Sequence, residues 1–265
     1  MAPAKSTVTV RRDGAVLTLR LERPDKLNAL DDSIRAGLAS ALADVEDDPT
    51  VRVIVVEGAG RAFSAGADLT GGAYPHLSSD HGSPDWATRR HLTGAWQRLL
   101  DQFGRVPQVT VARLHGHVIG GAALLGAACD LRVAADDTVL RIPELAIGIP
   151  LTWAGIPLLV REVGLPLTRD WVMTGRAVEA DELLRSGYAQ RVVAADDLGA
   201  AVAACVEELV SMPAGPLAMT RAMTAAIGRT TPAMVAGWAD PDLLQWSLRE
   251  PEGQDAAREY GRRLS

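Results

Sequence analysis

Two glycine-rich segments constrain the fold most strongly, because each follows an apolar run typical of a strand and precedes a helical pattern. The first is FSAGAD, residues 63–68, after the run 51–57, and the second is HGHVIGGAALLGAACD, residues 115–130, after 109–114. A strand that turns directly into a helix leaves the first backbone N–H groups of that helix without intrahelical acceptors. Two such turns can offer two donors to one developing negative charge, as in an oxyanion hole, which predicts chemistry at a carbonyl carbon or its α-carbon.

The apolar periodicity predicts an α/β chain that opens in the order β, β, α, β. Residues 7–12 and 15–21 alternate between apolar and polar side chains around an Asp-Gly pair, which indicates a β-hairpin. Asp31 or Asp32 can cap a helix whose apolar residues recur at the helical period. Further strands are expected at 109–114, 131–134, 139–142 and 190–194, and helices at 86–103, 122–128, 153–163, 167–174, 179–186, 197–211, 214–228 and 253–262.

The chain divides by composition near residues 195–200, where a β-containing core gives way to a helical region. We expect a core over residues 1–195 and a helical C-terminal region over 196–265. Segment 71–85 is rich in Gly, Ser, Pro and Asp and is the best candidate for a mobile loop. The ββα order is expected to recur over residues 7–46, 51–104 and 109–128.

The composition excludes several classes of protein. The formal net charge is −6 and the sequence has no basic block, so nucleic-acid binding is not expected. The longest apolar run, residues 118–129, has 12 residues, whereas a membrane span needs ~20, so no membrane association is expected. Cys129 and Cys205 form neither a disulfide framework nor a zinc pattern, and the N-terminus lacks a signal-peptide core, which predicts a cytoplasmic protein. No carboxylate set completes a metal site around His115 and His117, so no metal ion is expected.

Six motifs occur in the order seen in the crotonase superfamily, whose best-known members are enoyl-CoA hydratases and isomerases. They are ERPDKLNAL, VIVVEG, FSAGADL, HGHVIGG, ACDLRVAA and RIPELAIGI. The resemblance covers roughly residues 8–195 and implies a crotonase-like spiral of ββα units with a helical C-terminal region. It also implies an acyl-CoA thioester substrate, with CoA as part of the substrate and no separate cofactor. Members are typically trimeric or hexameric, so we expect a homotrimer or hexamer, with residues 196–265 supplying much of the contact.

The resemblance places the thioester oxygen between the backbone N–H groups of Ala67 and Gly121, in agreement with the two turns described above. Removal of an α or γ proton puts negative charge on this oxygen, and fixed donors stabilise that charge without reorganisation. The small residues at these positions let the backbone approach the thioester closely. The alternative is that both segments are only tight strand-to-helix turns.

Glu144 is the expected general acid/base. It lies in RIPELAIGI, directly after Pro143, and the resemblance implies a catalytic glutamate at this position. A carbon that loses or gains a proton needs a carboxylate within reach. The alternative is a solvated acid in the first turn of a helix, which Pro143 at the first helical position would favour.

Leu124 departs from the pattern of the hydratases that the chain resembles, which carry a second glutamate six residues before the aspartate of ACD, here Asp130. Leucine cannot activate water, and loss of one acid/base group weakens hydration by ~10²–10⁴. A double-bond shift needs one base, and some isomerases of the superfamily have leucine here. We therefore expect an enoyl-CoA isomerase. The alternatives are a hydratase with another second acid/base, for which Asp80, His81 and Asp85 are candidates, and a non-catalytic acyl-CoA-binding protein.

The resemblance also indicates contacts to CoA and to the acyl group. Lys26 suits a CoA phosphate, because a cation beside a phosphate is physically favourable. Asp68 has an alternative role as the cap of a helix after the FSAGAD turn. A terminal helix with Tyr260, Arg262 and Arg263 is expected to reach a neighbouring subunit's ligand, and the acyl-pocket width depends on residues 71–96 and 150–175. The expected substrate- or CoA-binding residues are Lys26, Leu27, Ala29, Ala65, Asp68, Leu69, Gly120 and Leu124.

Overall fold

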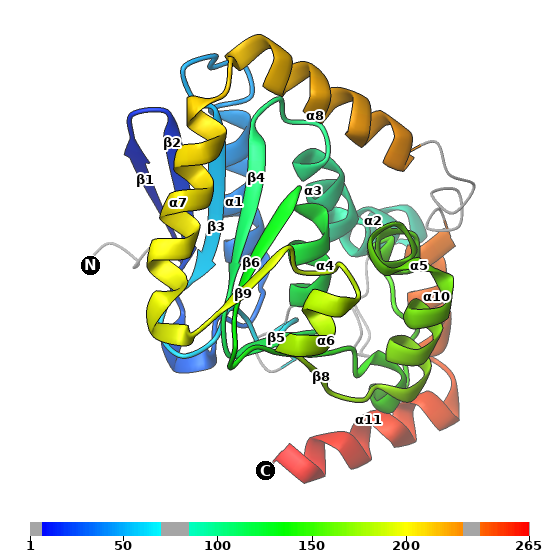
Figure 1. Cartoon of the computed structure of the whole chain (residues 1–265). Coiled ribbons are helices and arrows are strands. Elements are labelled where there is room, and N and C mark those ends of the chain that lie inside the picture. The colour runs from blue at the N-terminus through cyan, green and yellow to red at the C-terminus, as the bar shows by residue number, and fades with distance from the viewer. Residues whose placement is uncertain (1–6, 70–84, 230–238, 265) are drawn as a thin grey trace, which may run out of the picture.

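A six-stranded sheet forms the centre of the molecule in the computed structural model, which describes residues 7–69, 85–229 and 239–264 (Figure 1). The strand order is β1-β2-β3-β4-β6-β9; β1 and β2 are antiparallel and each later neighbour is parallel. The predicted hairpin and strands are therefore confirmed. The bounds are β1 Val8–Asp13, β2 Val16–Leu21, β3 Val53–Gly58, β4 Val109–Leu114, β6 Leu131–Ala135 and β9 Arg191–Val193.

The sheet is buried on both faces, as the β-branched composition of its central strand requires. In β3, Ile54 and Val56 belong to the main core cluster, whereas Val53 and Val55 belong to a second cluster that includes residues of α7 (Leu198–Ser211). Successive residues of a strand face opposite sides, so one short apolar run can serve both clusters. Figure 1 shows α7 in front of the sheet and α1 behind it.

A second, smaller sheet runs beside the first and shows how the units repeat. It contains β5 (His117–Ile119), β7 (Val139–Arg141) and β8 (Val178–Glu179), and an isolated parallel bridge joins Ser64 to Val118 of β5. Successive units thus place one strand in the large sheet and one extended segment in this second layer before a helix follows. The expected spiral of ββα units is confirmed.

The two helices predicted at 153–163 and 167–174 together form α5 (Gly155–Thr174), whose backbone is interrupted at Gly164 (φ 77°). The other helices agree with the predicted ranges, with two differences. Residues 86–103 form two helices, α2 (Trp86–Thr93) and α3 (Ala95–Phe103), because the chain leaves the helix at Gly94, so the prediction of one continuous helix is wrong. Sequence reasoning also missed α10 (Asp240–Ser247). The expected loop 71–85 lies outside the described residues except for Asp85. The other helices are α1 Asp32–Ala43, α4 Gly121–Ala128, α6 Ala180–Arg185, α8 Ala214–Arg229, α11 Pro251–Leu264 and the 3₁₀ turns η1 Pro24–Lys26, η3 Glu144–Ile147 and η4 Ala195–Asp197.

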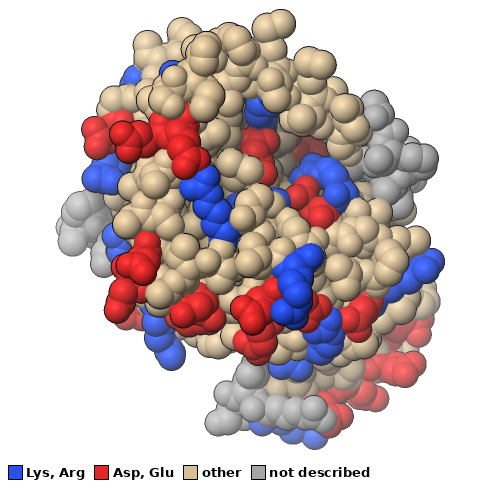
Figure 2. All heavy atoms as spheres, in the orientation of Figure 1, with Lys and Arg blue, Asp and Glu red and all other residues tan. Residues whose placement is uncertain are grey.

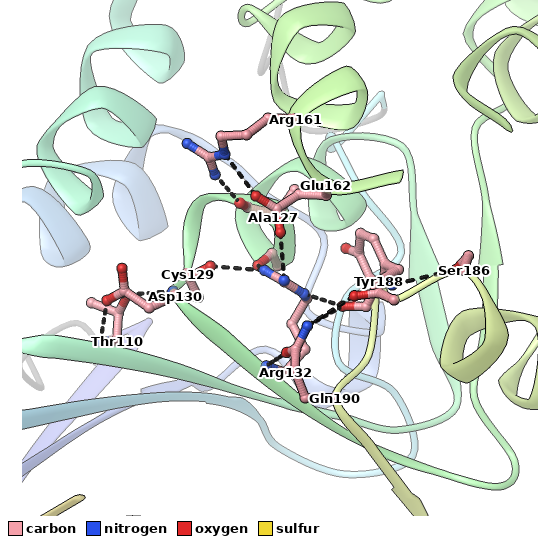
Figure 3. Close-up of polar contacts among 12 residues, drawn as sticks. Thr110, Ala127, Cys129, Asp130, Arg132, Arg161, Glu162, Ser186, Tyr188 and Gln190 are labelled. Carbon is pink, nitrogen blue, oxygen red and sulfur yellow. Dashed lines mark hydrogen bonds and ion pairs between the residues drawn. The ribbon is translucent and has the colours of Figure 1, made fainter. Parts of the chain in front are cut away.

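Helix α4 is buried along its whole length, so the carbonyl groups at its C-terminal end need partners from the protein. Arg132 donates hydrogen bonds to the carbonyls of Gly126 and Cys129, at 3.2 and 2.8 Å (Figure 3). Arg161 donates to the carbonyl of Ala127 at 2.6 Å. Nearer the start of the helix, the Tyr188 hydroxyl donates to the carbonyl of Ala123 at 2.6 Å. The two guanidinium groups also lie at the negative end of the helix dipole.

Glu162 neutralises the buried positive charge of Arg132 through an ion pair. Arg132 is 1% exposed and its Nη2 lies 2.5 Å from Oε2 of Glu162, whose other oxygen accepts from Arg161 at 2.6 Å. Arg132 also donates to the carbonyl of Tyr188, which ties α4 to the segment leading into β9. One side chain therefore fixes the helix, the neighbouring strand and α5 relative to one another.

The C-terminal helices pack onto this core through named contacts. Arg221 of α8 donates to the carbonyl of Phe103 at 2.7 Å and pairs with Asp130 at 3.2 Å. Asp130 also accepts from the amide and hydroxyl of Thr110, so its described contacts are structural. In the described ranges no single helix has the length and apolarity to cross a membrane; α7 and α8 pass such a test only when joined across a bend of 109°.

Replacement of Arg132 by methionine should destabilise the fold severely. The change leaves two buried carbonyls of α4 without this donor and removes the buried partner of Glu162, so we expect a loss of about 3–5 kcal/mol in the free energy of unfolding. Urea denaturation of the Arg132→Met and Arg258→Met variants measures the difference. Arg258 makes an exposed ion pair with Asp255, which should contribute less than about 1 kcal/mol. Equal losses in the two variants would contradict the role assigned to Arg132.

Candidate active site

Asn28 fixes the loop beside the FSAGAD turn. Its buried side chain donates to the carbonyls of Ala59 and Ala62, at 2.8 and 2.9 Å, and accepts from the amide of Arg23 at 2.9 Å. Its backbone is left-handed, with φ 55°, a conformation that asparagine tolerates better than most residues. Sequence reasoning missed this residue, although an asparagine inside a Pro-Asp-rich loop is a recognisable turn signal.

The FSAGAD segment is oriented by a parallel bridge to the same loop. The Leu30 amide donates to the carbonyl of Gly66 at 2.7 Å, and the Asp68 amide donates to the carbonyl of Leu30 at 2.9 Å. In this pattern the N–H and C=O of the intervening Ala67 point away from Leu30. Within the described part of the chain, the Ala67 amide donates no hydrogen bond, and Ala67 lines the pocket described below.

The second amide is that of Gly121, the first residue of α4. A Cβ at Gly66 (φ 81°) would lie 2.4 Å from the carbonyl oxygen of Ile119 and 3.7 Å from the amide nitrogen of Gly121, so the two turns are in direct contact. Like other amides at a helix start, that of Gly121 has no acceptor within its helix, and it donates to none of the described residues. Two amides from separate turns thus face one pocket.

The pocket is a cavity of about 70 Å³ between these turns, η3 and the segment before α5. It brings together seven of the predicted residues, which come from three of the six motifs and from the segment that follows HGHVIGG. They are Ala65, Ala67, Leu69, Gly120, Gly121, Leu124 and Glu144.

Glu144 presents its carboxylate to the two turns. A Cβ on Gly120, whose φ of 53° is left-handed, would lie 2.5 Å from Oε1 of Glu144, so the carboxylate rests against the glycine that precedes Gly121. The other oxygen, Oε2, is buried and has no hydrogen-bond partner among the described residues. Burial raises the pKa of Glu144 to about 7. Glu144 is the first residue of η3 and is half-buried as a whole, so its position fits the alternative of an acid in the first turn of a helix, whereas its carboxyl group is desolvated. A desolvated carboxyl group that titrates near neutral pH suits proton transfer.

Leu124 is buried beside another leucine. A Cβ added to Gly155 would lie 2.8 Å from Cδ1 of Leu124 and 2.7 Å from Cγ of Leu151, so both side chains pack directly against this glycine. Besides Glu144, the polar side chains that line the pocket within the described ranges are those of Thr152 and Tyr260. In the same ranges no three His, Cys, Asp or Glu side chains are grouped as a metal site would require.

Four predicted CoA contacts lie beside the pocket and do not line it. The carbonyl of Leu27 accepts a hydrogen bond from the amide of Ala65 at 2.8 Å. Because Ala65 lines the pocket, this bond places the loop that contains Lys26 and Ala29 at the edge of the pocket. Lys26 is exposed at the end of η1. Asp68 is buried and pairs with Arg23 at 2.8 Å, a partner that sequence reasoning missed.

Of the candidates for a second acid/base, only Asp85 is described. Asp80 and His81 lie outside the described residues, as does the segment that follows Leu69, where Asp68 was expected to cap a helix. Asp85 accepts from the amide of Thr88 and caps α2 on the surface.

The terminal helix α11 packs on η3, where Gly148 and Gly253 meet backbone to backbone. As a result Tyr260 lines the pocket of its own chain. The glycine contact brings α11 back over η3, and the expected reach of this helix to a neighbouring subunit's ligand stays a prediction. Arg262 is exposed, and the side chain of Arg263 lies outside the described part.

Comparison with known proteins gives consistent matches over most of the chain. Residues 11–241 match the family model described as enoyl-CoA hydratase/isomerase. The probable enoyl-CoA hydratase echA8 of Mycobacterium tuberculosis is 32% identical over 215 residues, which cover 81% of this chain and 79% of that protein. A probable enoyl-CoA hydratase of Bacillus subtilis is 33% identical over 182 residues, which cover 69% of this chain and 67% of that protein.

A solved structure extends the similarity to the whole fold. The enoyl-CoA hydratase/isomerase from Xanthobacter autotrophicus Py2 superimposes with a TM-score of 0.85 at 25% sequence identity, over 97% of this chain and 93% of that one. The C-terminal helices are thus part of the shared architecture.

Replacement of Glu144 by glutamine should stabilise the protein at alkaline pH. The folded-state pKa of about 7 lies above the ordinary 4.5, so the folded protein holds a proton that the unfolded chain loses, and stability falls as the pH rises through this interval. Glutamine cannot ionise, so the variant does not lose this stability at high pH. We expect the variant to be more stable by on the order of 3 kcal/mol at pH 8 and by less than about 1 kcal/mol at pH 5. Urea denaturation at both pH values measures this; a pH-independent difference would contradict the burial of an ionisable group here.

Proposed function

The chain belongs to the enoyl-CoA hydratase/isomerase family, and from this premise we propose that it is an acyl-CoA enzyme that shifts the double bond of a 3-enoyl-CoA. The proposal depends on one observation above all. The Glu144 carboxyl group, whose buried Oε2 has no hydrogen-bond partner among the described residues, lies beside two amides, while the nearby Leu124 is apolar.

The amides of Ala67 and Gly121 would hold the thioester oxygen. As the substrate loses a proton, charge develops on this oxygen, and each fixed donor can contribute ~10²–10³ in rate. The donors are preorganised because the bridge at Leu30 orients one turn and the buried helix α4 orients the other. The apolar pocket strengthens both hydrogen bonds by excluding water.

Glu144 would carry the proton. In its ionised form it removes a proton from C2 of the 3-enoyl thioester, which gives a dienolate held by the two amides. The same carboxyl group then returns the proton at C4, so that the 2-enoyl product forms and the carboxylate is restored. A pKa of about 7 leaves both forms available at neutral pH, which suits a group that alternates as base and acid.

Hydration is the second candidate, because the relatives described above are named hydratases. It requires a group that activates water at C3, and Leu124 cannot do so. Thr152 and Tyr260 are the other polar side chains on the pocket wall within the described ranges. A non-catalytic acyl-CoA binder is less favoured, since a binding pocket gains nothing from an unpaired buried carboxylate.

The CoA moiety would lie along the loop that contains Lys26, Leu27 and Ala29. Lys26 is exposed at the edge of the pocket and can approach a phosphate. Asp68 would support this region through Arg23 and not by direct contact, because its carboxylate is buried in that ion pair.

Turnover of paired substrates separates the candidates. We expect the wild-type protein to convert 3-enoyl-CoA to 2-enoyl-CoA, and Glu144→Gln to lower kcat/KM by ~10²–10⁴ because proton transfer is lost. Hydration of 2-enoyl-CoA should be slow in both proteins. Double-bond migration and water addition are followed by ultraviolet absorbance and mass spectrometry.

The matched control is Glu207→Gln on the exposed face of α7, which should leave turnover unchanged. Fast hydration by the wild type would favour the hydratase reading. Tight CoA-thioester binding without any turnover would favour the binder.

We also propose a homotrimer or hexamer. Met219, Met223 and Ile227 recur at four-residue spacing along one face of α8 and are 67%, 66% and 69% exposed. Figure 2 shows few charged side chains over α8, at the top of the molecule. An apolar face of this kind is typical of an interface.

Light scattering should give three or six times the chain mass of 28.0 kDa. Replacement of Met219 and Met223 by lysine should shift the protein toward smaller species, because the charges would have to be buried. A wild-type mass of 28.0 kDa would rule out the oligomer.

A further inference from the structure

Trp153 closes one side of the pocket next to the oxyanion donors. Its side chain is 4% exposed, and its ring stacks on that of Trp96, with centroids 4.7 Å apart and planes within 10°. A Cβ on Gly121 would lie 2.2 Å from Cζ3 of Trp153, so the ring rests directly against the glycine that begins α4. The indole therefore occupies space beside the carbon atoms that would react.

The backbone holds this ring in place at a cost. Trp153 and Ala154 are consecutive non-glycine residues with φ of 60° and 56°. Left-handed conformations of this kind persist only where the surroundings impose them, and they cluster at functional sites. Here Asp240 of α10 accepts a hydrogen bond from the Ala154 amide at 2.8 Å. Gly155 follows with no room for a Cβ, because Leu151 and Leu124 lie 2.7–2.8 Å from that position.

The remaining space is small. The cavity measures about 70 Å³, and one water-sized group needs roughly 10–15 Å³. A cavity of this size holds a few water-sized groups, and its volume is far below the ~300 Å³ at which drug-sized ligand pockets begin. The space that the described residues enclose therefore suits the thioester carbonyl and the next few carbons of an acyl chain.

We propose that Trp153, braced by Trp96 and positioned by Asp240, ends the acyl chamber and restricts the protein to short acyl groups of about four carbons. This inference rests on the proposed acyl-CoA function and names its substrate class. Trp153 is a specificity-determining residue in this account, and Asp240 is a positioning residue that acts through the Ala154 amide.

Binding of saturated acyl-CoAs tests the inference without any turnover. Isothermal titration of butyryl-CoA and octanoyl-CoA gives a ratio of dissociation constants for each variant. We expect the wild type to bind octanoyl-CoA at least ~10-fold more weakly than butyryl-CoA, because the longer chain must displace the stacked indoles. Trp153→Leu should reduce this discrimination by ~10-fold or more, because the shorter side chain opens the chamber.

Two further variants make the test specific. Asp240→Ala keeps both rings but removes the acceptor that holds the left-handed turn, so it should also weaken the discrimination, and it remains informative if Trp153→Leu does not fold. Trp246→Leu is the matched control, since this tryptophan of α10 is 63% exposed, and its ratio should equal that of the wild type.

The inference is overturned if the wild type binds octanoyl-CoA as tightly as butyryl-CoA. It is also overturned if folded Trp153→Leu and Asp240→Ala both keep the wild-type ratio. Failure of the proposed isomerisation is a separate result, because these ligands have no double bond. Glu144-dependent turnover of a 3-octenoyl-CoA at the rate of its four-carbon analogue would support the reaction while removing the size limit.

Discussion

The burial of α4 is the constraint on which the rest of the structure depends. A helix in the core must satisfy the carbonyls at its C-terminal end, and here Arg132 and Arg161 supply the donors. At the other end its first amide faces the pocket and donates to none of the described residues. The ACDLRVAA segment gains a physical explanation from this arrangement: Arg132 holds the end of the helix, and Asp130 ties it to β4 and α8. The catalytic proposal at Gly121 needs this support, because an amide is a preorganised donor only if its helix cannot move.

Close backbone approach explains the composition of the site. The left-handed glycines Gly66 and Gly120 have no room for a side chain, because a carbonyl and the Glu144 carboxylate lie where a Cβ would be. The same crowding removes water from Glu144 and raises its pKa. Desolvation therefore links two properties: it destabilises the fold at alkaline pH, and it makes the carboxylate a better base near neutrality. Active sites commonly combine a local loss of stability with a gain in reactivity.

Much of this arrangement could be predicted from the sequence, because the signals were local. The β-branched run of β3, the alternating hairpin around Asp-Gly and the glycine-rich segments predicted the strands and the two turns that meet at the pocket. The break at Gly94 was missed because the apolar helical pattern continues on both sides of a glycine, which a helix tolerates. The Trp153–Trp96 stack, the Arg23–Asp68 pair and the position of Asp240 join residues far apart in the chain, and no local pattern encodes such contacts. The sequence alone shows that residue 124 is a leucine, whereas only the structure shows that its side chain is tightly packed against Gly155.

The central claim is that a thioester carbonyl lies between two free amides while one carboxylate moves the proton. A crystal structure with a bound, non-reacting butyryl-CoA tests it most directly. The account predicts that the thioester oxygen lies about 2.7–3.2 Å from the amide nitrogens of both Ala67 and Gly121, with a carboxylate oxygen of Glu144 facing C2. A thioester that turns its oxygen away from either amide, or a Glu144 side chain that points out of the pocket, would contradict it.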